Sequence, residues 1–258
     1  MTTREEFIRR ATRVTSFNLS LSDFTSDKHK DTIRHLYQTY FFASLLDAKY
    51  IQSFDSSGVA VKQYNFLVDR LKRDNRQQFE KLHFSTVPGI GPSELAMYIL
   101  TDGILSGGAQ SKDLTLGNKH YEIKAAKLYH KKSGTRSQMF DFKLGSTIAG
   151  MDGVIHALQS EMYSRKLIST KHPTSITTTQ LRQFKEADER TYNRISEEYG
   201  ILAAAYLNSG KNGVIFIQNE KNQKDFGHIL ALKHGFKSED IMMERYTAGV
   251  IKPIVNIK

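Results

Sequence analysis

Two short runs of alternating apolar and polar residues, joined by a Gly-Asn turn, constrain this chain more than any other part of its sequence. Asp113 begins the first run, and the second run contains Glu122 and Lys124. This pattern is typical of a tight hairpin, which we predict over residues 113–126. Side chains in a strand alternate between faces, so Glu122 and Lys124 are expected on the same face. The hairpin would therefore gather two carboxylates and an ammonium group, as a divalent metal ion and an attacking water require.

The composition excludes several classes of protein. With 258 residues, the chain is long enough for one large domain or for one domain with a helical extension. It contains no cysteine, so any metal must be held by oxygen or histidine. No apolar run approaches the roughly 18–20 residues of a membrane span, and the charged N-terminus lacks the apolar core of a signal peptide. We therefore expect a cytoplasmic protein without a membrane partner.

The chain is strongly basic, with a formal net charge of +10 and an isoelectric point of about 9.5. Such a balance favours polyanionic partners, because lysine and arginine neutralise phosphates and release counterions. The alternative is that the charge serves solubility alone. One helix, expected over residues 58–84, carries cations that either face phosphates or are simply solvated: Lys62, Arg70, Lys72, Arg73, Arg76 and Lys81.

The spacing of apolar residues predicts a mixture of helices and strands. Helices are expected over residues 3–14, 26–54, 58–84, from Pro92 to about 101, 151–165, 181–208 and 222–234. Besides the hairpin, strands are expected over residues 139–144, 213–218 and 249–257. Helices thus bracket a mixed sheet, which indicates an α/β or α+β fold. We expect a helical N-terminal region over residues 1–86 and a core over residues 87–258, with a helical insertion at about 165–208.

The hairpin residues have the chemistry that phosphodiester hydrolysis needs. Mg²⁺ prefers oxygen ligands and keeps several waters, so two or three carboxylates suffice, and Mn²⁺ is an expected substitute. Asp113 and Glu122 would supply carboxylates, and the backbone carbonyl of Ile123 a further oxygen. Lys124 would lie beside the attacking water, where it could lower the pKa of that water, orient it or stabilise the phosphate. The alternative is a surface hairpin whose charges are solvated.

The stretch resembles the motif of the PD-(D/E)xK nuclease superfamily, which includes type II restriction enzymes, Holliday-junction resolvases and phage recombination exonucleases. The residues that carry the resemblance are Asp113-Leu, Gly117 and Tyr121-Glu122-Ile-Lys124. Lys112 stands where the eponymous pattern has proline, and the resemblance covers about residues 90–220 at most. It implies a restriction-endonuclease-like mixed β-sheet core of α-β-β-β-α-β order. It also implies metal-dependent cleavage, with metal ligands at Glu94, Asp113 and Glu122 and a catalytic Lys124.

Two further groups of residues have alternative interpretations. Glu94, in the first turn of the helix that starts at Pro92, is similar to an additional acid of many family members, but could merely interact with the helix dipole. A basic segment trails from the hairpin and either meets the DNA backbone or forms a flexible solvated loop. Its proposed DNA-binding cations are Lys127, Lys131, Lys132 and Arg136.

These features predict an Mg²⁺-dependent endonuclease, restriction-like or phage-encoded, that cleaves double-stranded DNA in the cytoplasm of its own cell or of a phage host. The rival interpretation is a non-catalytic DNA-binding or virion structural protein on the same core, whose acids serve stability. RNA cleavage needs similar metal chemistry, and nothing in the sequence discriminates the sugar. The N-terminal helices are expected either to form a homodimer or to clasp DNA.

Overall fold

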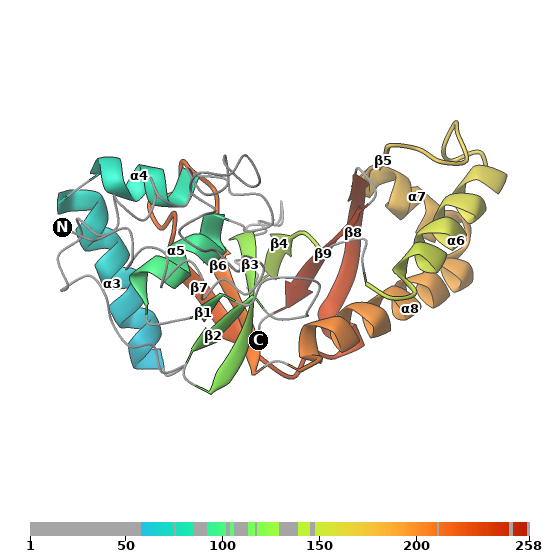
Figure 1. Ribbon diagram of the computed structural model, residues 1–258. Helices are drawn as coiled ribbons and strands as arrows, with labels where there is room; N and C mark the ends of the chain where they lie inside the picture. Colours follow the sequence, from blue (N-terminus) through green and yellow to red (C-terminus); the bar gives the residue numbers. More distant parts are fainter. Residues whose placement is uncertain are drawn as a thin grey trace, which may run out of the picture. The chain divides into compact units, whose positions relative to one another are not determined.

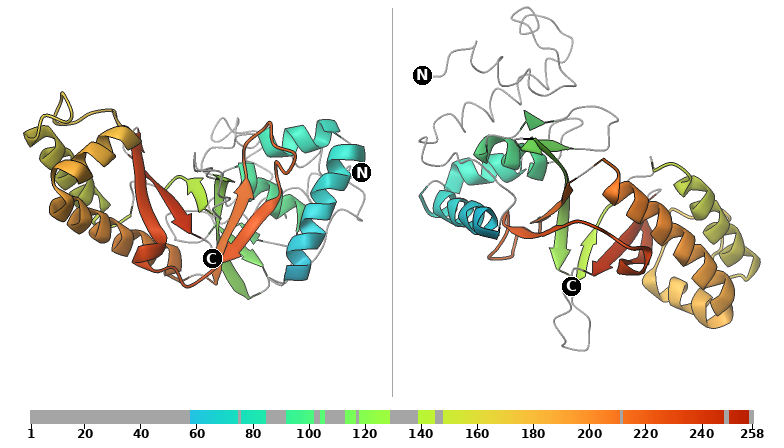
Figure 2. Two further views of the ribbon diagram at one scale, coloured as in Figure 1. Left: turned by 180° about the vertical axis from the view of Figure 1, so that it is seen from behind. Right: turned by 90° about the horizontal axis from the view of Figure 1, so that it is seen from below.

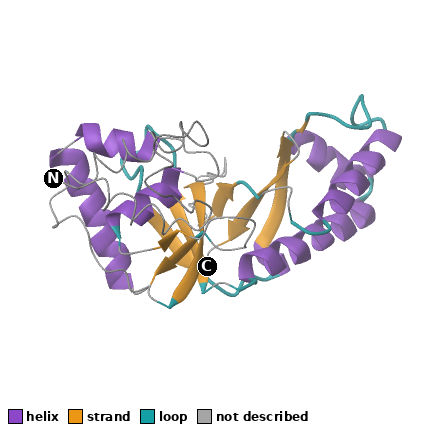
Figure 3. Cartoon of the chain, viewed as in Figure 1, coloured by secondary structure: helices purple, strands orange, loops and turns teal. Residues whose placement is uncertain are grey.

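The structure, a computed structural model, describes residues 58–74, 76–84, 92–101, 104–105, 113–116, 118–128, 139–144, 148–210, 212–247 and 250–256. The helices predicted over residues 3–14 and 26–54 lie outside this part of the chain. The described residues form two compact units that both combine helices and strands (Figure 3). The first holds the residues up to Ala125 together with Gly210–Leu232, and the second holds Ala126–Ser209 together with the residues from Lys233 onward.

Among the described residues of the first unit, three helices accompany a set of short strands. The helices are α3 (Gly58–Asp74), α4 (Arg76–Phe84) and α5 (Pro92–Leu100). The strands are β1 (Ile104–Leu105), β2 (Leu114–Leu116), β3 (Lys119–Leu128), β6 (Gly213–Gln218) and β7 (Ile229–Lys233), and β3 continues into the second unit. Hydrogen-bonded neighbours follow the order β1-β2-β3-β6-β7. The antiparallel β2–β3 register pairs Leu114 with Tyr121, which confirms the predicted hairpin.

The first unit is held together by apolar side chains at helical and strand spacing. An apolar stripe on α3 and α4 is buried, including Tyr64, Leu67, Leu71 and Phe79. All residues of β6 are buried as well, as expected for a strand that is covered on both faces. Because each fully buried large apolar side chain contributes about 1.5–3 kcal/mol, this packing is the main source of stability for the unit.

Helix α3 is joined to the β6–β7 hairpin by two polar side chains one turn apart. Asn65 donates to the carbonyl of Ile229 at 2.9 Å and accepts from the N–H of Ile229 at 2.7 Å. Asp69 Oδ1 lies 2.7 Å from His228 Nε2. The left view of Figure 2 shows α3, in blue, beside the paired orange strands. These contacts link a helix early in the chain to a hairpin near its end.

In the second unit, antiparallel strands pack against a group of helices. The strands are β4 (Met139–Phe142), β5 (Ser175–Ile176), β8 (Ile241–Thr247) and β9 (Val250–Asn256). The helices are α6 (Met151–Ser164), α7 (Thr178–Ala187), α8 (Glu189–Asn208) and the short 3-10 helix η3 (Ser238–Asp240). The end of β3 pairs with β4, and the order continues β4-β9-β8-β5. Helix α8 packs against α6, α7 and β8, and Figure 1 shows the long helices gathered on one side of β8 and β9.

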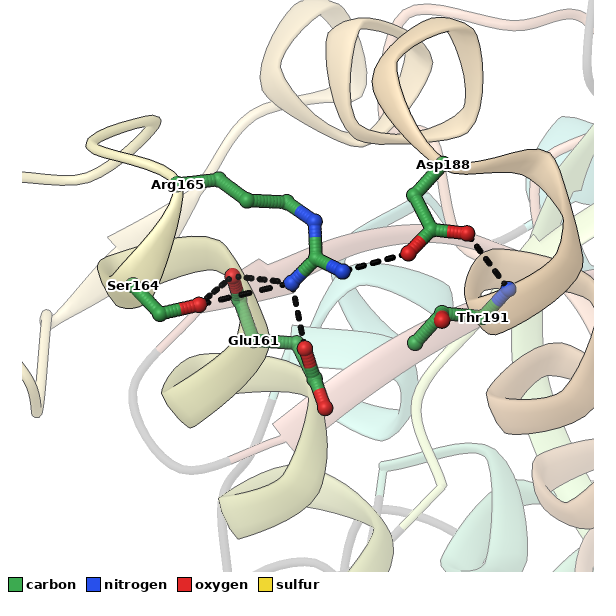
Figure 4. Close-up of polar contacts among 5 residues, drawn as sticks. All are labelled: Glu161, Ser164, Arg165, Asp188 and Thr191. Atoms are coloured by element: carbon green, nitrogen blue, oxygen red, sulfur yellow. Dashed lines mark hydrogen bonds and ion pairs between the residues drawn. The ribbon is translucent and has the colours of Figure 1, made fainter.

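The chain turns sharply at Asp188, so the single helix predicted over residues 181–208 is two helices. Asp188 ends α7 and caps α8, because its Oδ1 accepts from the N–H of Thr191 at 3.0 Å. Its Oδ2 pairs with the guanidinium of Arg165, which also pairs with Glu161 on α6 (Figure 4). The hydrogen bonds from Thr191, followed by the contact with Arg165, lower the pKa of Asp188. The network fixes the end of α6 to the start of α8.

The helix predicted over residues 222–234 is wrong, since the chain turns there and then forms β7. Gly227 has a left-handed φ of +85°, and a Cβ at this position would lie only 2.8 Å from His83 Nε2. The N–H of Gln218 donates to the carbonyl of His228 at 2.9 Å and so closes the β6–β7 hairpin. Pairing with β6 and burial against α3 outweigh the local helix preference of the segment.

Other sequence predictions agree with the structure more closely. The strands expected over residues 139–144, 213–218 and 249–257 are present with small shifts at their ends. The helix starting at Pro92 is present, and the helix expected over residues 58–84 is divided between α3 and α4. The described residues therefore form a mixed α+β structure, as predicted.

The division of the chain into units differs from the domain boundary that the sequence predicts. The compact units divide between Ala125 and Ala126 and again at the borders of 210–232. The boundary expected at residue 86 concerned a helical N-terminal region, and it stays a prediction. None of the helices described here is long and apolar enough to cross a membrane.

A buried histidine lies at the contact between α4 and the β6–β7 turn. His83 Nδ1 lies 3.0 Å from the carbonyl of Phe79, which can only accept, so this nitrogen carries the proton. The ring packs on Phe79 and edge-on against Phe226, at centroid distances of 4.3 and 5.8 Å. Burial is the main cause that lowers the pKa of His83 from 6.5 to about 4, with smaller contributions from Lys72 and His228.

We predict that His83 makes stability fall in acid. In the unfolded chain the imidazole takes up a proton near pH 6.5, whereas the folded state resists protonation down to about pH 4. Its contribution is therefore complete above pH 6.5 and is lost as the pH falls toward 4, by about 3 kcal/mol. Urea unfolding as a function of pH should show a shallower decline for His83→Gln than for the wild type. His156→Gln, which replaces an exposed histidine, is the matched control. Superimposable curves for His83→Gln and wild type would contradict the assignment.

Candidate active site

Asp113 is anchored to β3 through both its backbone and its side chain. Its N–H donates to the carbonyl of Tyr121 at 2.9 Å, and its Oδ2 accepts from the N–H of Ile123 at 2.8 Å. The carboxylate thereby satisfies a strand N–H at the point where β2 begins. The structure thus places Asp113 against the backbone of β3 between Glu122 and Lys124, the two residues with which the sequence grouped it.

Glu122 and Lys124 project from the same face of β3, and their side chains meet. The distance between Lys124 Nζ and Glu122 Oε1 is 2.6 Å. Tyr121 and Ile123 project from the other face and are only 1% and 3% exposed. The alternation expected from the sequence is therefore observed, with an apolar face in the core and a polar face that carries the candidate residues.

The polar face extends toward the turn of the hairpin. Thr115 and His120 are opposite each other in the β2–β3 register, and Thr115 Oγ1 lies 2.8 Å from His120 Nδ1. The backbone N–H of His120 donates to Asn212 Oδ1 at 2.7 Å, just before β6 begins. Contacts on both sides hold this part of β3 in place, so the side chains of Glu122 and Lys124 project from a supported strand.

The burial of Glu122 argues against a solvated surface hairpin. Its side chain is 1% exposed, and that of Lys124 is 17% exposed. Carboxylates are almost never this buried unless they are paired, because removing the charge from water costs several kcal/mol. A pair of apolar side chains of similar volume would often be at least as stable in such a place. The buried pair is therefore not explained by stability alone.

Glu94 lies in the first turn of α5, as expected, and is half-buried. Its neighbours Ala96, Met97 and Leu100 are fully buried, so they attach α5 to the core. This position suits both interpretations of Glu94, the interaction with the helix dipole and the coordination of a metal. The assignment of Glu94 as a ligand stays a prediction.

The donor chemistry of the hairpin fits a hard cation such as Mg²⁺. Asp113 and Glu122 offer carboxylate oxygens, and one hydrogen bond does not exhaust the acceptor capacity of a carboxylate. Within the described residues, no group of three or more acidic or histidine side chains is placed to hold a metal ion. Glu94, Asp113 and Glu122 therefore do not form a closed cage. A site with two carboxylates, the carbonyl of Ile123 and water would be an open one.

The cations named from the sequence have different environments. Lys127 is in β3, in the second unit, where its Nζ lies 3.7 Å from Asp141. Lys131, Lys132 and Arg136 lie outside the described residues, so their proposed contact with DNA stays a prediction.

The cations on α3 and α4 mostly have partners within the protein. Arg70 pairs with Asp74, Arg76 pairs with Glu80, and Lys72 Nζ donates to the carbonyl of Lys224 at 3.1 Å. Burial of the Lys72 side chain lowers its pKa, and Asp69 and Asp225 act in the opposite direction. These contacts favour the solvated and structural interpretation of this helical face over a phosphate-binding one.

Comparisons with known proteins identify no relative of the chain. No model of a protein family matches the chain, and no curated protein or solved structure matches it either.

We predict that the Glu122–Lys124 pair is strongly coupled in stability. Lys124→Met leaves a buried carboxylate without its ammonium partner, which should cost about 3 kcal/mol in free energy of unfolding. Adding Glu122→Gln to that variant should recover most of the loss, because no buried charge remains. Chemical denaturation of both single variants and of the double variant measures the coupling. Additive effects would show that the two side chains do not depend on each other.

Proposed function

We propose that the chain is a divalent-metal-dependent endonuclease that hydrolyses phosphodiester bonds of DNA, with a restriction-endonuclease-like core. The observation that carries the proposal is the buried carboxylate of Glu122, joined to Lys124 on the polar face of β3, with Asp113 anchored to Ile123 between them. Two carboxylates and an ammonium group so close together on one hairpin have an obvious use in phosphate chemistry and little value for packing.

The order of the elements supports the finer assignment of the fold. Apart from the two-residue strands β1 and β5, helix α5 precedes strands β2, β3 and β4, helices α6, α7 and α8 follow, and β6 then pairs with β3. This order is compatible with the α-β-β-β-α-β core that the resemblance implies. The carboxylates lie at the start of β2 and in the middle of β3, where a hairpin from sequence-local residues can hold them.

In the proposed reaction, Asp113, Glu122 and the carbonyl of Ile123 would hold the metal ion, and Glu94 is a further candidate ligand. When bound, Mg²⁺ would supply Lewis-acid polarisation of the phosphate and stabilisation of the developing negative charge. A cation held there would also balance the charge of Glu122, which Lys124 balances in the structure. The ammonium group can then orient the attacking water or donate to a non-bridging phosphate oxygen. The backbone bond from Ile123 keeps the carboxylate of Asp113 beside these groups.

The experiment that tests the proposal compares four substrates with Mg²⁺ or EDTA: supercoiled plasmid, linear duplex, branched DNA and RNA. Discrete metal-dependent DNA fragments would support restriction-like cutting, and a smear would support non-specific cutting. Cleavage of RNA alone would mean that the substrate is RNA and not DNA. Binding without any product would favour the rival, a non-catalytic DNA-binding or virion structural protein.

Replacement of Lys124 should abolish cleavage while duplex binding is kept. The expected reason is that Lys124 acts on the water and phosphate rather than on the affinity for DNA. Lys124→Met should cut at less than a tenth of the wild-type rate, a loss of more than about 1.4 kcal/mol in barrier stabilisation. Lys119→Met, which replaces an exposed lysine of the same strand, should cut normally. Circular dichroism ensures that both variants are folded. Near-normal cutting by folded Lys124→Met would refute its role.

Asp113→Asn and Glu122→Gln should each weaken the binding of Mg²⁺ and Mn²⁺. Both changes keep the shape of the side chain but remove the charge that attracts the cation. An asparagine amide oxygen can still accept from the N–H of Ile123, so the hairpin should persist in the first variant. Calorimetric titration of the metal without DNA is the measurement. An unaltered metal affinity in either variant would remove that residue from the ligand set.

A further inference from the structure

Four cations and one carboxylate lie on one face of the strands of the second unit. We call this set the basic face: Lys127, Asp141, Lys143, Arg245 and Lys252. Lys127 is opposite Asp141, and Arg245 is opposite Lys252, in the antiparallel registers. Asp141 is opposite Ile254, which is two residues from Lys252 and so on the same face. Opposite residues of an antiparallel pair also share a face, so Lys127, Asp141, Arg245 and Lys252 project together across β3, β4, β9 and β8. Lys143 follows the end of β4 and is close enough to Lys252 to act on its charge.

The charges on the basic face do not balance. Arg245 Nη2 lies 2.6 Å and Lys127 Nζ 3.7 Å from Asp141 Oδ2. Asp141 is only 6% exposed, whereas the side chains of Arg245 and Lys127 are 35% and 44% exposed. One carboxylate thus stands among four cations, which leaves an excess of three positive charges. Asp141 pairs with Arg245 and Lys127 from its buried position, and these two cations stay partly exposed to solvent.

A β-bulge places a cation where regular pairing would place an acid. The register shifts between Met243 and Arg245, so that Arg245 lies opposite Lys252. Regular pairing continued from Met243 would instead put Glu244 opposite Lys252 and would largely neutralise the face. Glu244 instead accepts a hydrogen bond from Thr178 Oγ1 of α7 at 3.0 Å, so its carboxylate contacts a helix. Bulges often re-aim a side chain next to a functional site.

The basic face is the side of the strands that α8 does not cover. On the other face of β8, Met243 and Tyr246 are 4% and 7% exposed, and the hydroxyl of Tyr199 on α8 donates to the carbonyl of Ile251 at 3.3 Å. Met242, on the side of the basic face, is 42% exposed. Helix packing therefore uses one face of this strand group. On the other face, Ile254 and Asp141 are buried, at 2% and 6% exposed, and the cations around them stay partly exposed.

The cations also repel one another. Burial of Lys252 lowers its pKa, and Arg245, Lys143 and Lys127 lower it further, while Asp141 raises it. The charged form of Lys252 is therefore disfavoured by its surroundings. A bound anion would relieve this repulsion, as phosphate groups do when they replace counterions.

We propose that the basic face binds the phosphate backbone of duplex DNA. The cations come from β3, β8, β9 and the end of β4, and their charged ends gather around Asp141, with Arg245 Nη2 at 2.6 Å and Lys127 Nζ at 3.7 Å from its Oδ2. With three positive charges in excess, the cluster is complementary to the phosphate groups of a polyanion, whose counterions it would replace. The inference rests on the proposed function only for the identity of the polyanion, and it gives that function a surface for binding its substrate.

The test is the salt dependence of DNA binding by the full chain, measured in EDTA so that nothing is cleaved. Fluorescence anisotropy with a short labelled duplex should show a weaker salt dependence for Lys143→Ala/Lys252→Ala than for the wild type. The slope of log K against log salt should flatten by about 0.9 per lost phosphate contact, or about 1.8 for both. Arg182→Ala/Lys237→Ala is the matched control, since it removes the same charge from exposed residues of the same unit.

Two results would overturn the inference. The first is an unchanged slope for the basic-face variant, or an equal change in the control, which would mean that only net charge matters. The second is wild-type binding to anionic phospholipid vesicles but not to duplex DNA, which would assign the face to a lipid surface. Lys143→Arg/Lys252→Arg keeps the charges and should retain the wild-type slope. That result would show that the flatter slope of the alanine variant comes from lost charge and not from misfolding. Wild-type protein that binds duplex but never cuts it with Mg²⁺ would refute the endonuclease proposal and leave this one standing.

Discussion

The carboxylate of Glu122 keeps its position because a strand with one apolar face supports it. Tyr121 and Ile123 anchor β3 in the core, and this same alternation directs Glu122 toward Lys124 on the other side. A shift of one residue in the register would exchange the two faces and bury both charges in the apolar core. The ladder with β2, the bond from Ile123 to Asp113 and the contacts with β6 all oppose such a shift.

The parts of the fold that the sequence predicts are those whose signals are local. The hairpin follows from a turn and two alternating runs, and α5 follows from Pro92 and an apolar stripe. The helix expected over residues 222–234 is wrong because partners distant in sequence decide its structure, namely β6 and Asn65 on α3. The strand β8 is absent from the prediction because its bulge interrupts the alternation. Tertiary pairing outweighs local preference in both segments.

The same distinction applies to the candidate sites. Asp113, Glu122 and Lys124 fall within one hairpin, so their proximity can be read from the sequence, although the depth at which Glu122 is buried cannot. The basic face joins β3 to β8 and β9, more than a hundred residues apart in the chain. Only the strand order and the bulge bring Lys127, Arg245 and Lys252 onto one side. No spacing in the sequence signals that arrangement.

The amide of Asn65 has a consequence for the contacts that the sheet can make with other molecules. Among the described strands, β7 pairs only with β6, so its outer side is a sheet edge. Asn65 occupies both the N–H and the carbonyl of Ile229 on that side, in the way that another strand would. Open edges recruit strands from other molecules and start aggregation, and covering the edge with a helix is one way to prevent it. The side chain of Asn65 thus takes the two backbone groups of Ile229 that a strand from a second copy would need at this point of the edge.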